Sequence, residues 1–177
     1  MIKKIFILTV VFSIILSCTS GDESNSEPDQ LQNGFTFEND FHKTTFAYFR
    51  DDNTANDDPQ EIAIVLANVD ILNTNQNSGV NVVSIEVFQS NLEEEMLSSL
   101  NEYEVYLNVS INNQTINTDS GEIILEEDTT GIMATSIQVN VIEFSKSRLH
   151  IEFSFTREDG KEIKGLYNGP YTDLSNY

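Results

Sequence analysis

Residues 149–156, Leu-His-Ile-Glu-Phe-Ser-Phe-Thr, decide the fold class of this chain. Every odd position in the stretch is apolar and every even position is polar, and side chains on a β-strand point alternately to opposite faces of the sheet. The pattern therefore predicts a strand with one face in a hydrophobic core and the other in water. Comparable signals predict further strands at 44–49, 62–66, 83–87, 105–111 and 137–141.

Turn signals separate the predicted strands. Asn112-Asn113, residues 145–147 and residues 158–161, which contain Asp-Gly, stand where short hairpin loops should fall. Hairpins in succession imply antiparallel pairing of about eight or nine strands between Phe35 and Tyr167. We predict an all-β fold, an antiparallel β-sandwich. The alternative is an up-and-down, lipocalin-like β-barrel, which would enclose a ligand cavity.

One segment departs from the β pattern. Asn91 could cap a helix whose first turn holds three glutamates, Glu93 to Glu95. Apolar residues then recur on one helical face. We therefore predict one short helix near 92–101, which closes one end of the core or serves as a lid over a cavity.

The first seventeen residues have the features of a secretory signal peptide. Lys3 and Lys4 precede an apolar run of 12 residues, Ile5 to Leu16, which contains only Thr and Ser as polar interruptions. A membrane-spanning helix needs roughly 20 such residues, so the run is too short to cross a bilayer. We predict that residues 1–17 are removed on export.

The predicted cleavage site carries more specific information. Residues 15–18, Ile-Leu-Ser-Cys, resemble the bacterial lipobox, in which an obligatory cysteine becomes the lipidated first residue. Two or three acyl chains on Cys18 make a stable membrane anchor, since one chain alone binds only marginally. Because Cys18 is the only cysteine, an intramolecular disulfide and cysteine-rich zinc sites are excluded. We predict an exported lipoprotein that begins at Cys18.

A polar segment follows the cysteine. Residues 18–33 consist mainly of Ser, Gly, Pro, acids and amides, with Leu31 as the one aliphatic residue. Such a composition cannot bury enough apolar surface to fold, so we predict a disordered acidic tether. Residues 34–177 are long enough for a single β-domain.

The charge of the chain restricts its partners. After cleavage at Cys18 the chain would carry 7 Lys and Arg against 29 Asp and Glu, a formal charge of −22. Nucleic acids and anionic lipid surfaces present phosphates that require Lys and Arg, so both are excluded as partners. The lipid anchor is the predicted link to the membrane.

No pattern in the sequence names a reaction. His42 and His150 have no His or Cys at ligand spacing, and we predict that both are surface residues. There is no Gly-x-Ser-x-Gly motif and no glycine-rich phosphate loop. Carbohydrate platforms usually use exposed aromatics, but Trp is absent. Tyr167, Tyr171 and Tyr177 either form a small patch or pack against the last strand. We expect a protein that is not an enzyme and has no cofactor.

One acidic segment is a candidate calcium site. Residues 51–58 contain four aspartates and two asparagines, which supply the hard oxygen ligands that calcium prefers. The segment lacks the central glycine and distal glutamate of an EF-hand loop. A solvated loop is one interpretation, and a weak calcium site is the other, with the candidate ligands Asp51, Asp52, Asn53, Asp57 and Asp58.

Two stretches resemble a known group of proteins. Residues 34–49 (GFTFENDFHKTTFAYF) and 139–171 (VNVIEFSKSRLHIEFSFTREDGKEIKGLYNGPY) are similar to small uncharacterised lipoproteins of Bacteroidetes, flavobacteria especially. In that group an aromatic opening accompanies a closing hairpin with an Asp-Gly-Lys turn. This sequence has Leu149-His150 where the hairpin often has a glycine. The resemblance implies outer-membrane lipoprotein export and brings no catalytic residues.

These observations lead to one functional expectation and one alternative. We expect a non-enzymatic binding or interaction module, anchored by lipid to the outer membrane on its periplasmic side or at the cell surface. The alternative is a small-molecule carrier with an internal cavity. The sequence identifies no ligand or protein partner for either.

Overall fold

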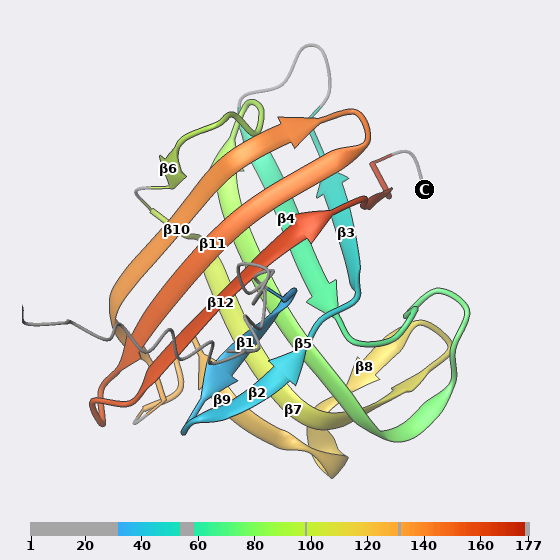
Figure 1. Cartoon of the computed structure of the whole chain (residues 1–177), viewed down its shortest axis with the longest axis vertical. Helices are drawn as coiled ribbons and strands as arrows, with labels where there is room; N and C mark the ends of the chain where they lie inside the picture. Colours follow the sequence, from blue (N-terminus) through green and yellow to red (C-terminus); the bar gives the residue numbers. More distant parts are fainter. Residues whose placement is uncertain (1–31, 54–58, 98, 131, 176–177) are drawn as a thin grey trace, which may run out of the picture. The chain divides into compact units, whose positions relative to one another are not determined.

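The computed structural model describes residues 32–53, 59–97, 99–130 and 132–175, and these form two packed β-sheets (Figure 1). The first sheet has six strands in the order β2-β1-β12-β11-β10-β6. Their bounds are β1 Gly34–Phe37, β2 Asp40–Lys43, β6 Met96–Leu97, β10 Ala134–Ser145, β11 Arg148–Arg157 and β12 Glu162–Gly169.

The second sheet has seven strands in the order β13-β3-β4-β5-β7-β8, with β9 also paired to β7. Their bounds are β3 Phe46–Asp51, β4 Gln60–Ala67, β5 Gln76–Gln89, β7 Glu102–Asn112, β8 Thr115–Asn117, β9 Glu122–Glu126 and β13 Thr172–Asp173. All pairs are antiparallel, as predicted, except that of the two-residue strand β13 with β3, which is parallel and lies beyond the predicted strands.

The structure confirms that residues 149–156 form a strand with one buried face. Leu149, Ile151, Phe153 and Phe155 of β11 are buried, while the polar side chains between them face outward. Inward residues of the other sheet, including Phe49, Ile64, Ile85 and Val105, belong to the same apolar cluster. The two sheets therefore pack face to face as a sandwich. They do not close into a barrel, so the alternative fold is wrong.

Three predicted turns join neighbouring strands. The turn between β7 and β8 lies one residue later than the predicted Asn112-Asn113: Asn113 and Gln114 connect the strands, and both have positive φ, as two-residue hairpin turns favour. Lys146-Ser147 connects β10 to β11, and the loop 158–161 connects β11 to β12. Eight strands have five or more residues, close to the predicted number. The remaining five are short pieces, and four of them are edge or terminal strands that the alternation could not reveal.

The predicted helix near 92–101 is wrong. Leu92 and Leu97 are buried, whereas Met96 is 64% exposed, which is not the burial pattern of one helical face. Backbone groups here bond to the sheets: Val141 donates to the Glu95 carbonyl at 2.8 Å, and Asn101 donates to the Glu86 carbonyl at 2.7 Å. A ten-residue helix is marginal by itself, so pairing with a long neighbouring strand prevails. Across the described residues the only helical element is a three-residue 3-10 turn, Thr118–Ser120.

A second apolar cluster lies on the other face of the seven-stranded sheet. It includes Tyr48, Val80, Val82 and Tyr106 and is covered in part by Ile71. The Tyr48 hydroxyl accepts a hydrogen bond from the Ile71 amide at 2.9 Å and donates to Asp70 at 3.0 Å. This sheet is therefore partly covered on both faces, which leaves the outer face of the six-stranded sheet more open. Within the described ranges, no helix has the length and apolar character needed to cross a membrane.

Candidate functional site

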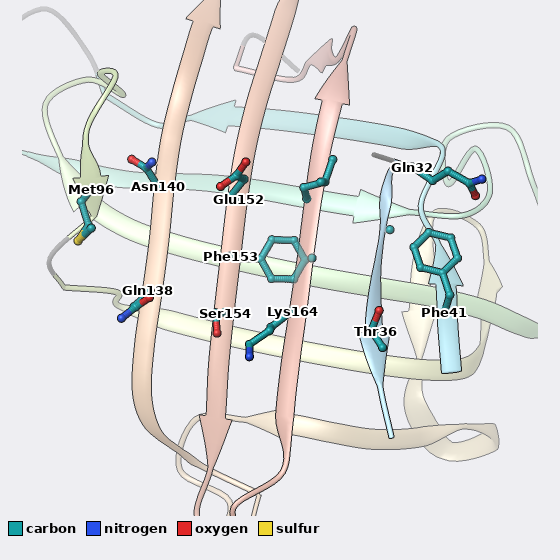
Figure 2. Close-up of a pocket in the computed structure, with 13 residues that line it drawn as sticks. Gln32, Thr36, Phe41, Met96, Gln138, Asn140, Glu152, Phe153, Ser154 and Lys164 are labelled. Atoms are coloured by element: carbon teal, nitrogen blue, oxygen red, sulfur yellow. The ribbon is translucent and has the colours of Figure 1, made fainter. Parts of the chain in front are cut away.

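A groove of about 620 Å³ runs across the outer face of the six-stranded sheet (Figure 2). Its floor consists of outward side chains on β1, β10, β11 and β12. Phe41 on β2 lines one edge, and Met96 on β6 lines the opposite edge. The groove lies within the volume range of ligand sites in proteins and makes this face the candidate site.

The strand register arranges the lining into two rows. The first row crosses the sheet through cross-strand pairs and consists of Gln138, Ser154, Lys164, Thr36 and Phe41. The second row lies beside the first, two residues along each long strand, and consists of Met96, Asn140, Glu152, Leu166 and Gly34. Because residues two apart on a strand share a face, both rows face outward together. The floor thus combines polar side chains with the apolar Phe153 and Leu166, and Phe41 and Met96 lie at its two edges (Figure 2).

Five uncharged polar side chains in the groove have no hydrogen-bond partner within the described part of the chain: Gln32, Thr36, Gln138, Asn140 and Ser154. Many other amide side chains of the protein bond to the backbone. Asn68, for example, donates to the Gly79 carbonyl at 2.9 Å, and Asn33 accepts from the Asn168 amide at 2.8 Å. The groove amides have no such structural task, so they are available to a ligand.

The charged groups in the groove balance each other. Glu152 and Lys164 are the acid and the base of its lining, although the chain has a net charge of −20. The Lys164 ammonium lies 2.6 Å from Glu162, beside the groove. His150 Nε2 lies 3.8 Å from the Glu152 carboxylate. The candidate site is therefore formally neutral within a strongly acidic protein.

The edge formed by Phe41 depends on Gly34. Phe41 is 48% exposed, and its ring lies against Gly34, where a Cβ atom would come within 2.6 Å of the ring Cζ. Gly34 has φ +154°, a value that residues with a side chain adopt rarely. The glycine therefore lets the aromatic ring lie over the backbone of β1.

The outer face of the other sheet has a different electrostatic character. Glu86 pairs in register with Glu102 on β7, and Arg50 and Glu61 lie nearby. Burial, followed by repulsion from Glu61 and Glu102, raises the pKa of Glu86 to about 7. Arg50 pairs with both Asp52 and Glu61. Among the described residues, no three His, Cys, Asp or Glu side chains are arranged to hold a metal ion.

The predicted calcium ligands are only partly described. Asp57 and Asp58 lie outside the described residues, as does Cys18. Asp51 accepts hydrogen bonds from the Asn53 amide at 2.9 Å and the Asn53 side chain at 2.6 Å, and Asp52 lies 3.3 Å from Arg50. Asn53 accepts from the Gln60 amide. The oxygens at 51–53 thus have partners in the protein, and calcium binding stays a prediction.

The histidines and C-terminal tyrosines have structural contacts. The His42 ring packs 5.1 Å from the buried Phe35, so His42 is partly buried. Tyr167 is buried, and its hydroxyl donates to the Pro170 carbonyl. Tyr171 packs against Phe49 and Phe144. Tyr167 and Tyr171 therefore pack against the core, while Tyr177 lies outside the described residues.

Comparisons with protein-family models, with curated proteins and with solved structures found no match for this chain. The site is therefore defined by its own geometry. The sequence analysis did not identify Phe41 as a groove residue. The available signal was weak: within Asp40-Phe41-His42-Lys43, the alternation is too short to show which face is buried.

Proposed function

We propose that this protein is a lipid-anchored, exported binding module of the outer membrane, which acts without catalysis and holds its ligand in the groove on the six-stranded sheet. The observation that carries the proposal is the set of five uncharged polar side chains in the groove that have no hydrogen-bond partner among the described residues. Exposed amides and hydroxyls on a rigid sheet, flanked by apolar groups, are typical of a preformed binding surface.

The anchor is proposed from the sequence. A positively charged start, an apolar run of 12 residues and the lipobox-like stretch before Cys18 support lipidation of that cysteine. In the sequence, the polar residues 19–33 connect the proposed lipidated cysteine to the β-domain, and Asn33 at the end of this segment bonds to Asn168 of β12. Both the periplasmic side and the cell surface remain compatible with this proposal.

The packing between the sheets favours a surface site over the alternative of an internal carrier. Large side chains such as Phe35, Phe155, Leu149 and Tyr167 are at most 1% exposed and belong to one continuous apolar cluster. A carrier would hold its ligand in that region. The groove instead lies on the outer face of the sheet (Figure 2).

The anchor is tested by comparing wild type with Cys18→Ala in detergent phase separation. We expect wild type to enter the detergent phase and the variant to remain in the aqueous phase, because only the wild type would have acyl chains. Equal partitioning of the two proteins would overturn the lipoprotein assignment.

The groove is tested by capture from a native envelope extract. Full-length wild type is compared with Gln138→Ala/Asn140→Ala, and with Asn101→Ala/Asn112→Ala as a matched control at exposed amides outside the groove. We expect a component that wild type and the control retain and the groove variant loses. Equal retention by all three proteins would show that the groove is not the binding surface.

A further inference from the structure

We propose that the ligand of this groove is a short, neutral saccharide. The inference rests on the proposed function and adds the chemical class of the ligand. Three features of the groove support it independently: the hydrogen-bonding groups on its floor, the ring at its edge and its balanced charge.

The floor carries groups that both donate and accept hydrogen bonds. Gln138 and Asn140 each present a carbonyl oxygen and an amino group, and Thr36 and Ser154 each present a hydroxyl. A sugar hydroxyl also donates and accepts, so adjacent hydroxyls match an amide side chain with two hydrogen bonds. Glu152 adds a charged acceptor, and a hydroxyl group donates a stronger hydrogen bond to a carboxylate than to a neutral acceptor.

The edge supplies an apolar surface of suitable shape. Phe41 is 48% exposed, and its ring lies over Gly34 beside the polar floor. One face of a pyranose ring presents C–H groups, which pack favourably on the electron-rich face of an aromatic ring. Met96 at the opposite edge is 64% exposed and offers a flexible apolar contact there.

The charge of the site favours a neutral ligand. Glu152 would repel an anionic ligand, as would the net charge of −20. Lys164 places a positive charge in the same lining as Glu152 and so disfavours a cationic ligand there. A neutral, hydroxyl-rich molecule meets neither penalty.

The position of the groove favours a saccharide over an extended peptide. A peptide that binds a sheet satisfies its main chain by joining an edge strand. The groove lies across the face of the sheet, where the strands pair with one another and only side chains reach the ligand. The edge strands that bound this face, β2 and β6, have four and two residues.

The test uses isothermal titration of the full-length lipidated protein in detergent micelles with a panel of neutral di- to tetrasaccharides. The panel covers gluco-, manno-, galacto- and xylo-configured sugars in both anomeric linkages. Variants are Asn140→Ala and Phe41→Ala, with Asn112→Ala and Phe88→Ala as controls, because Phe88 is 57% exposed on the other sheet.

We expect at least one saccharide to bind and each groove variant to weaken that binding about tenfold, whereas the controls leave it unchanged. Melting temperatures of all variants show that they are folded. Binding that is equal in groove and control variants would overturn the proposal, as would the absence of binding across the panel. Suppose that no saccharide binds but wild type still captures a component of the envelope extract that the groove variant loses. The binding function then stands, and the saccharide assignment is wrong.

Discussion

The ring of Phe41 occupies the space that a side chain on Gly34 would need. A Cβ atom on Gly34 would lie 2.6 Å from Cζ and 2.9 Å from Cε2 of that ring, and it would also collide with the His42 carbonyl oxygen. Real Cβ atoms do not approach other heavy atoms so closely. The glycine and the phenylalanine thus form a single structural unit in the β1–β2 hairpin, and that unit builds one edge of the groove.

Gly34→Ala should therefore destabilise the hairpin and displace the Phe41 ring. We expect a loss of about 2 kcal/mol in the free energy of unfolding, because the backbone is strained at φ +154° and the new methyl group overlaps a backbone oxygen. Chemical denaturation measures this loss. Thr36→Ala on the same strand is the control, with an expected change below about 0.5 kcal/mol at an exposed position. Equal stabilities of the two variants would contradict this account of Gly34.

Arg157 should stabilise the end of the sandwich through a buried hydrogen bond. Its Nη1 donates to the Ile124 carbonyl at 2.7 Å, and its Nη2 lies 2.9 Å from Asp159. The guanidinium also lies 5.4 Å above the Phe37 ring. Arg157→Met keeps the apolar stem but leaves the Ile124 carbonyl without this donor. We expect a loss of about 2 kcal/mol on thermal or chemical unfolding.

An exposed arginine provides the control for that substitution. Arg148 donates to Asn168, and its side chain is 51% exposed. Arg148→Met should cost less than about 1 kcal/mol, because exposed ion pairs and hydrogen bonds contribute little. If Arg157→Met is as mild as Arg148→Met, the buried hydrogen bond does not stabilise the fold.

Glu86 should make the protein less stable as the pH rises. Its pKa in the folded chain is about 7, raised from 4.5 mainly by burial, so the folded state binds this proton more tightly than the unfolded state. The resulting stabilisation is fully present below pH 4.5 and is lost as the pH rises through 7. Glu86→Gln should therefore stabilise the protein by about 1 kcal/mol at pH 8, after allowance for solvent screening, and have little effect at pH 4.

Melting curves between pH 4 and pH 8 test this dependence. Glu122→Gln removes the same charge at an exposed position and controls for the general relief of repulsion in an acidic chain. The Glu86 variant should show the larger gain at pH 8. A gain that is the same at every pH, or the same in both variants, would contradict the shifted pKa.

The sequence predicted the long strands well because their signal is local. Residues 149–156 alternate over eight positions, and burial in the structure follows the alternation residue by residue. The prediction of a helix at residues 92–101 is wrong because helical spacing and capping residues report only a local preference. Pairing of Met96 and Leu97 with β10 is a long-range interaction, and no local pattern reports it.

The candidate site could not be predicted for a related reason. Its rows combine residues from positions 34–41, 96, 138–140, 152–154 and 164–166, which only the register brings together. Each groove residue looks like an ordinary solvent-facing residue of its strand. The sequence predicts which face of each strand is polar. It does not predict which strands are neighbours, so it cannot predict the surface that those faces form together.

The most direct test of the central claim measures whether the groove is covered in the native envelope. Ser154→Cys places a thiol in the groove, and Ser84→Cys places one on the outer face of the other sheet at a partly exposed position. Cys18 is the only natural cysteine, so the new thiol is the only free one when Cys18 carries lipid. Maleimide labelling rates are compared for purified protein and for protein in native membranes. We predict that labelling at position 154 slows in native membranes while labelling at position 84 does not. Equal protection at both positions, or none at 154, would contradict the claim that this face is the binding surface.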